Sequence, residues 1–184
     1  MNTYAILVRG INVGGKNKVA MADLRSYLEK LNFENVSTYI ASGNIILDSD
    51  KSPAIVKQSI EKLLPEKFHL DSELIKVLVL THDQLKAVVD NKPKGFGDEP
   101  DKYHSDAIFL IDIDAETAMA IFDPRDGVDK VWPGIGVIYS QRLSAERTRS
   151  RLSKIIGTPL YQSMTIRNWN TTTKLLEIIK STAK

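Results

Sequence analysis

The alternation of apolar and polar residues along the chain predicts eight short β-strands. Runs with a period of two, and short apolar runs bounded by turn residues, are typical of strands, because successive side chains of a strand point to opposite faces of a sheet. The runs lie at Thr3–Arg9, Val36–Ile40, Asn44–Asp48, Leu74–Leu80, Ala107–Ile113, Val128–Trp132, Gly136–Ser140 and Met164–Arg167.

Between these runs, apolar residues recur at the period of an amphipathic α-helix. The spacing i, i+3, i+4, i+7 in Leu24–Leu31 and the similar pattern in Val56–Leu64 predict two helices, and a shorter pattern predicts a third at His82–Val89. Proline at the first position after a serine is a typical helix start, and Ser52 precedes Pro53 in this way. Further candidate N-caps for later helices are Ser144 and Asn170.

The order of these elements is βαββαβ, and it occurs twice. It predicts an α+β fold of two tandem ferredoxin-like halves packed together, each an antiparallel sheet of spatial order 4-1-3-2 with its helices on one face. We expect the first half at residues 1–90, a linker loop rich in glycine and proline at 91–104, and the second half with a C-terminal helix at 105–184.

The spacing of the two halves differs at one place. Asn44 and Gly136 lie 92 residues apart, as do other equivalent positions, whereas Ile6 and Ile108 lie 102 apart. The first half therefore carries about ten extra residues, Gly10–Val19, between its first strand and first helix, where such loops usually have roughly 2–6 residues. Because the second half makes the same connection without them, these residues are candidates for function.

The extra residues have the composition of an anion-binding loop. Adjacent glycines allow backbone N–H groups to approach a ligand, and the helix that follows favours negative charge at its N-terminus. The string is neither the P-loop nor the dinucleotide fingerprint, so the pattern does not name a specific ligand. Its candidate ligand-binding residues are Arg9, Asn12, Gly14, Gly15, Lys16 and Asn17.

Two other segments are candidate parts of a site. In a 4-1-3-2 sheet the Ser42-Gly43-Asn44 hairpin lies at the same edge as the long loop, although this string is also ordinary turn chemistry. The second segment runs from a strand end into the last helix, where first-turn N–H groups could receive an anion. Its candidate residues are Arg167, Asn168, Trp169 and Asn170, of which Trp169 is equally typical of a core or interface anchor.

Composition narrows the class of protein. The chain has 184 residues, 42% of them hydrophobic, which is typical of globular proteins. The absence of cysteine excludes disulfides and thiolate chemistry and suits a cytoplasmic location, and the apolar run Tyr4–Val8 is too short for a signal peptide or membrane span. We therefore expect no membrane association, and the oligomeric state, monomer or dimer, stays open.

Charge is unevenly distributed. Residues 141–184 hold nine Lys or Arg and two Asp or Glu, a net +7, which leaves −5 for residues 1–140. The spacing of Arg147, Arg151 and Lys154 predicts one basic face on a helix that follows Ser144; this face is either solvated or anion-binding. No metal site or cofactor is predicted, because the histidines are isolated in the sequence: His69, His82 and His104.

Long stretches resemble a widespread bacterial family of cytoplasmic proteins known as a domain of unknown function. The resemblance rests on RGINVGGKNKVAMADLRSYLEKLNFENVSTYIASGN at Arg9–Asn44, TRSRL at Thr148–Leu152 and MTIRNWNTTTKL at Met164–Leu175. It implies the paired ferredoxin-like fold and no particular activity. The family's signature positions match the candidates above and add Lys174, while Ala20 and Arg151 stand where the family usually has proline and lysine.

Three functional hypotheses remain. The leading one is a non-enzymatic binding protein for a phosphate-bearing small molecule or nucleic acid at the Gly14-Gly15 loop. The second is an enzyme acting on a small anionic metabolite, in which Lys16 or Arg9 would stabilise developing charge. The third is an interaction protein that uses Trp169 and the basic helix. No recognisable catalytic constellation supports the second hypothesis.

Overall fold

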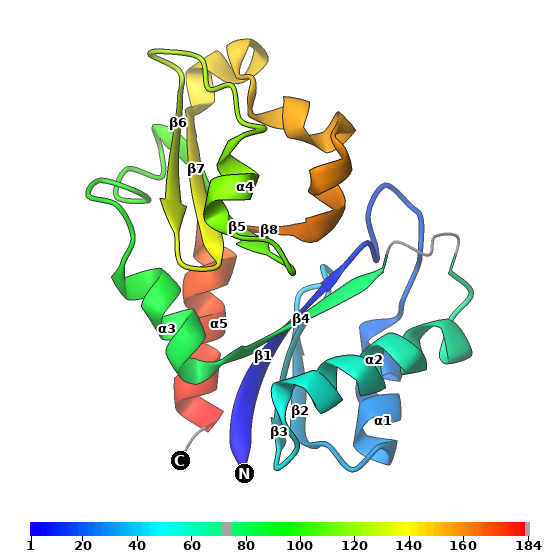
Figure 1. Cartoon of the computed structure of the whole chain (residues 1–184). Helices are drawn as coiled ribbons and strands as arrows, with labels where there is room; N and C mark the ends of the chain where they lie inside the picture. The colour runs from blue at the N-terminus through cyan, green and yellow to red at the C-terminus, as the bar shows by residue number, and fades with distance from the viewer. Residues whose placement is uncertain (71–74, 183–184) are drawn as a thin grey trace. The chain divides into compact units, whose positions relative to one another are not determined.

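The computed structural model describes residues 1–70 and 75–182 and confirms the α+β architecture. The chain divides into two compact units: Met1–Lys86 with Lys174–Lys184, and Ala87–Thr173. Each unit contains one four-stranded antiparallel sheet (Figure 1).

The first unit has the predicted sheet order, β2-β3-β1-β4. All its neighbouring strands are antiparallel, and Figure 1 shows α1 and α2 on one face of the sheet. The elements are β1 (Asn2–Arg9), α1 (Met21–Lys30), β2 (Glu34–Tyr39), β3 (Asn44–Ser49), α2 (Pro53–Lys67) and β4 (Lys76–Thr81), followed by α3 (His82–Asp90). Leu74, the predicted first residue of the fourth strand, lies outside the described residues.

The core of the first unit explains why these elements form. Alternate residues of β1, among them Ile6 and Val8, pack against apolar residues of both helices, such as Leu28 of α1 and Ile60 of α2. These side chains are almost completely buried. The apolar strand residues, which recur with a period of two, and the apolar helix residues, which recur with a period of 3.6, therefore pack into one layer, as the sequence pattern predicts.

The second unit repeats the topology, with the sheet order β6-β7-β5-β8. One face of this sheet packs on α4 and on the turn that contains Ile155, and the shared apolar cluster includes Ile108, Ile138 and Ala118. The elements are β5 (Tyr103–Leu110), α4 (Ala115–Met119), β6 (Asp129–Gly134), β7 (Val137–Leu143), the 3₁₀ helices η1 (Ser144–Arg149), η2 (Leu152–Gly157) and η3 (Pro159–Ser163), and β8 (Met164–Asn168). The helix α5 (Trp169–Thr182) begins in this unit, and its residues from Lys174 onward belong to the first unit.

The segment predicted as a linker, 91–104, packs on the other face of this second sheet. Phe96 is fully buried, and its ring makes edge contacts with Trp132, Tyr139 and Trp169, at centroid distances of 5.0–6.0 Å. The last two residues of the segment belong to β5, which begins at Tyr103 rather than at Ala107.

The prediction of a basic α-helix after Ser144 was wrong. The chain forms short 3₁₀ helices there, with Ser150 in an extended conformation between η1 and η2, and Ser144 makes no capping hydrogen bond. The backbone N–H of Arg151 donates to Asp129 Oδ2 at 2.8 Å, a long-range bond that holds the chain out of a continuous helix. Arg147, Arg151 and Lys154 therefore do not share one helical face.

Candidate functional site

The long loop Gly10–Ala20 between β1 and α1 is held together at its base by two asparagine side chains. Asn12 Nδ2 donates to the carbonyl oxygens of Val19 and Ala41, at 2.9 and 2.8 Å, and its Oδ1 accepts from the Val19 N–H at 2.8 Å. Asn17, which is buried, donates from Nδ2 to the Gly10 carbonyl at 2.9 Å. Both asparagines therefore shape the loop, and their amides are engaged with backbone atoms.

The tip of the loop is exposed and depends on its glycines. Gly14 and Gly15 have φ angles of +58° and +77°, values that L side chains rarely adopt, and a Cβ on either residue would meet no neighbour. Lys16 closes the turn through its N–H, which donates to the Val13 carbonyl at 3.1 Å. The glycines are thus required for backbone conformation, and the Lys16 side chain extends from an exposed turn.

The Ser42-Gly43-Asn44 hairpin lies beside the loop, as the sheet topology predicted. The Val8 N–H donates to the Gly43 carbonyl at 2.8 Å, and a Cβ on Gly43 would lie 2.7 Å from the Val8 oxygen. Asn44 is fully buried and donates to the Tyr39 carbonyl and to Ser42 Oγ. Gly43 and Asn44 therefore join the hairpin to the sheet, and of the three residues only Ser42 is partly accessible.

A groove of 600 Å³ opens between the loop and the hairpin. Its walls combine apolar groups with Lys18 and with the first residues of α1, where Ala20 provides no side-chain cap for the helix N-terminus. Ile40 on the hairpin side is 54% exposed and has a φ of +49°. The residues that line the groove are Asn12, Gly15, Lys18, Val19, Ala20, Met21, Thr38, Ile40 and Ala41.

Arg9 is the last residue of β1 and is half-buried, opposite Lys76 of β4 in the sheet register. It is not among the residues that line the groove, and neither is Lys16. Lys18, which the sequence reasoning did not select, does line it. Its proximity to the N-terminus of α1 could have been anticipated from its place two residues before Ala20.

The segment Arg167–Asn170 lies in the second unit. Arg167 is 7% exposed, and burial lowers the pKa of its guanidinium to about 10. It donates to Thr165 Oγ1 at 2.9 Å and to the Ile166 carbonyl at 2.8 Å. This arginine is therefore part of the interior of the second sheet.

The cap of α5 is Asn168 rather than Asn170. The helix begins at Trp169, and Asn168 Oδ1 accepts a hydrogen bond from the Asn170 N–H at 2.9 Å. Trp169 is 7% exposed and packs against Phe96, and a Cβ on Gly97 would lie 2.4 Å from its ring. Trp169 therefore acts as a core anchor in the second unit, the more conservative of the two roles that the sequence allowed.

The structure reveals a polar pair that the sequence reasoning missed. His104 Nε2 lies 3.0 Å from Asp106 Oδ2, because both residues lie on β5 with the i, i+2 spacing that places side chains on one face of a strand. The predicted strand began at Ala107, which left both residues outside it. A strand extended to Tyr103 would have shown that His104 is not isolated.

Among residues 1–70 and 75–182, no group of three or more His, Cys, Asp or Glu side chains could hold a metal ion. No helix in the same ranges is long and apolar enough to cross a membrane.

These features define an α+β protein with two ferredoxin-like sheets and an inserted glycine loop. The chain belongs to the family described as Protein of unknown function (DUF1697), whose model matches residues 1–139. Its structure is similar to that of a conserved bacterial protein from Streptococcus pneumoniae, with a TM-score of 0.80 and 29% sequence identity over 97% of this chain and 98% of that one. No curated protein matches the chain.

Proposed function

We propose that this protein binds a phosphate-bearing ligand, a nucleotide or nucleic acid, in the groove between the Gly10–Ala20 loop and the hairpin that follows β2. The observation that carries the proposal is the lining of the groove. It joins a cation, Lys18, to the uncapped N-terminus of α1 and to an apolar wall. A cation and free helix amides suit phosphate, and an apolar wall suits a base.

The conformation of Ile40 supports a binding role for the apolar wall. A β-branched residue with φ near +49° is a backbone outlier, and such conformations cost of order 1–3 kcal/mol. The Ile40 side chain is 54% exposed and lines the groove. A ligand that covers Ile40 would recover apolar contact that the folded chain alone does not provide.

The proposal favours binding over catalysis. The residues that line the groove include no carboxylate or histidine, the side chains that most often act as general bases. The side-chain amide of Asn12 is hydrogen-bonded to backbone atoms. The groove therefore offers charge, N–H donors and apolar surface, a combination that suits the binding of a ligand.

The test is titration of the protein with nucleotides and with single-stranded oligonucleotides at two salt concentrations. Lys18→Ala should weaken binding of either ligand, and for a nucleic acid it should reduce the slope of log K against log salt by about one. Lys62→Ala is the matched control, because Lys62 is an exposed lysine of α2 and its change removes the same charge. Affinity that is equal in the Lys18→Ala and Lys62→Ala proteins would refute the proposal.

A further inference from the structure

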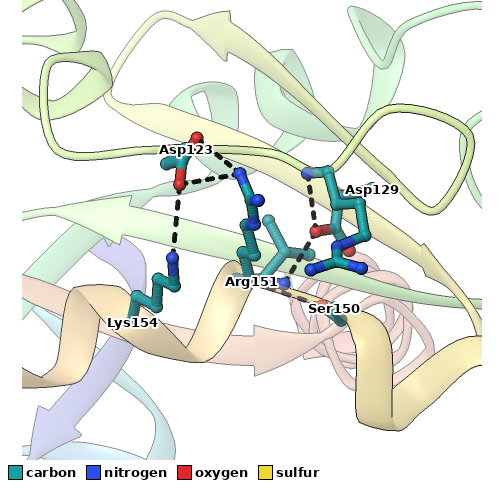
Figure 2. Close-up of polar contacts among 7 residues, drawn as sticks. Asp123, Asp129, Ser150, Arg151 and Lys154 are labelled. Atoms are coloured by element: carbon teal, nitrogen blue, oxygen red, sulfur yellow. Dashed lines mark hydrogen bonds and ion pairs between the residues drawn. The ribbon is translucent and has the colours of Figure 1, made fainter.

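Several cations of the basic C-terminal quarter are paired with carboxylates. Asp123 accepts from Arg151 Nη1 at 3.1 Å and from Lys154 Nζ at 3.3 Å, as Figure 2 shows. Arg149 pairs with Glu146 at 3.1 Å. The basic composition of this region therefore does not translate into a uniformly basic surface.

Arg142 and Arg147 of the same region differ from these paired residues in having no close ion pair with a described residue. Among the residues that the structure describes, neither Arg142 nor Arg147 forms an ion pair within 4 Å or a side-chain hydrogen bond. Arg142 lies near the end of β7 and is half-buried, whereas Arg147 is exposed on η1. The Arg147 guanidinium is therefore available to a ligand, and Arg142 acts on the Asp106 carboxylate through its charge without a hydrogen bond to it.

Both arginines line one recess of 420 Å³, together with His104 and Ser144. The sheet brings two of these residues together, because His104 of β5 is directly opposite Arg142 of β7 in the register. Arg147 and Ser144 approach from η1, which follows β7 without a break. The volume is within the range of about 300–1,000 Å³ that is usual for small-molecule sites.

His104 is held in place by Asp106. The carboxylate oxygen lies 3.0 Å from Nε2, which leaves Nδ1 without a partner among the described residues. Burial raises the pKa of the Asp106 carboxyl above its ordinary value, and the charges of His104 and Arg142 oppose that rise. The carboxylate is thus compensated within the fold, and the recess keeps a net positive charge.

A second compartment of 230 Å³ adjoins this recess and shares His104 and Ser144 with it. Its lining includes Trp169 and Asn170, the first two residues of α5. Amide side chains, an indole edge and a helix N-terminus are suited to the polar body of a small molecule. The two compartments together can receive a ligand with an anionic end and a hydrogen-bonding end.

We propose that the second unit has its own binding site for a small phosphomonoester, with the phosphate between Arg142 and Arg147 and the rest of the molecule toward Asn170 and Trp169. Guanidinium groups match phosphate through paired N–H donors, and hydrogen bonds between charged partners are among the strongest in proteins. This site does not depend on the groove of the first unit.

The experiment is calorimetric titration of the full chain with inorganic phosphate, ribose 5-phosphate and ribose. We expect ribose 5-phosphate to bind more tightly than inorganic phosphate, and ribose not to bind measurably. Arg147→Ala should weaken ribose 5-phosphate binding about tenfold, the loss of one charge-assisted contact. Arg149→Ala is the matched control from the same 3₁₀ helix, because its guanidinium is paired with Glu146.

Arg142→Lys provides a second measurement, because it keeps the charge in β7 but loses the planar pair of donors. We expect a loss of affinity with an unchanged midpoint of unfolding. Equal affinity of the wild type, Arg147→Ala and Arg142→Lys would overturn the proposal, as would absence of ribose 5-phosphate binding to the wild type.

Binding lost in Lys18→Ala and kept in Arg147→Ala would assign phosphate to the first unit alone. Preference for an oligonucleotide, abolished by Arg147→Ala, would replace the small ester as the ligand.

Discussion

Replacement of Asn12 tests whether the side-chain hydrogen bonds of the Gly10–Ala20 loop stabilise the fold. Three hydrogen bonds join the Asn12 side chain to backbone atoms and have lengths of 2.8–2.9 Å; two of them, with Val19, close the loop, and the third, to Ala41, joins the loop to the hairpin. At a net value of about 1 kcal/mol each, they contribute about 3 kcal/mol. Asn12 also has a φ of +54°, so Asn12→Ala adds a backbone cost of about 1 kcal/mol. We expect a total loss of about 4 kcal/mol in the free energy of unfolding.

Asn32→Ala is the control for the backbone cost. Asn32 has a φ of +61° in the turn after α1, is exposed, and has no side-chain hydrogen bond with a described residue. Its replacement should cost about 1 kcal/mol, so the difference between the two variants isolates the side-chain bonds. Urea unfolding followed by circular dichroism measures both. Equal losses in the two variants would show that the Asn12 bonds contribute nothing to the fold.

Asn12→Asp separates hydrogen bonding from size. The introduced carboxylate keeps an acceptor for the Val19 N–H but faces two carbonyl oxygens, at the positions where Nδ2 now donates. We expect it to be at least as destabilising as alanine at pH 7 and to recover part of the loss at acidic pH, where the protonated form can donate once. A loss of stability on acidification, relative to the wild type, would contradict this reasoning.

Two further predictions concern other contacts of the fold. Gly43→Ala should cost about 3 kcal/mol and Gly14→Ala about 1 kcal/mol, because both have positive φ but only the first would press a Cβ against the Val8 oxygen, at 2.7 Å; equal unfolding midpoints would refute the steric argument. Burial raises the pKa of Tyr139 to about 12, and its hydroxyl donates to the Val88 carbonyl at 2.6 Å. The hydroxyl stays protonated in the folded chain while it ionises in the unfolded one, so its contribution to stability is complete below pH 10 and is lost as the pH rises to about 12. Up to about 3 kcal/mol of this decline should be absent in Tyr139→Phe, and parallel pH profiles of the two proteins would contradict the shift.

Sequence periodicity predicted the topology because the signal is local and repeated. Each strand alternates over several residues, and the period of two in β1 needs no knowledge of its neighbours. The excess length of the Gly10–Val19 loop was visible for the same reason, since it rests on counting between equivalent strands.

The differences between the sequence predictions and the structure have long-range causes. The charged positions Arg147, Arg151 and Lys154 have helical spacing, but the chain there is fixed by Asp129, a residue from another element that accepts from the Arg151 N–H. Asn12 also forms a long-range hydrogen bond, because its partner Ala41 is 29 residues away in the sequence. Spacing within one segment does not predict such bonds, so the sequence alone does not distinguish signature residues that hold the fold from residues that contact a ligand.

The closure of the loop at its base has a consequence for protein engineering. The Asn12 N–H donates to the Asn17 carbonyl at 3.0 Å, and Asn17 Nδ2 donates to Gly10, so the bonds that close the loop lie outside its four-residue tip, Val13–Lys16. Val13, Gly14, Gly15 and Lys16 are all exposed. A combinatorial library that varies only Val13 and Lys16, with Asn12, Asn17 and the glycines of the loop retained, should therefore consist largely of folded proteins, and new ligand preferences could be selected from it without redesign of the sheet.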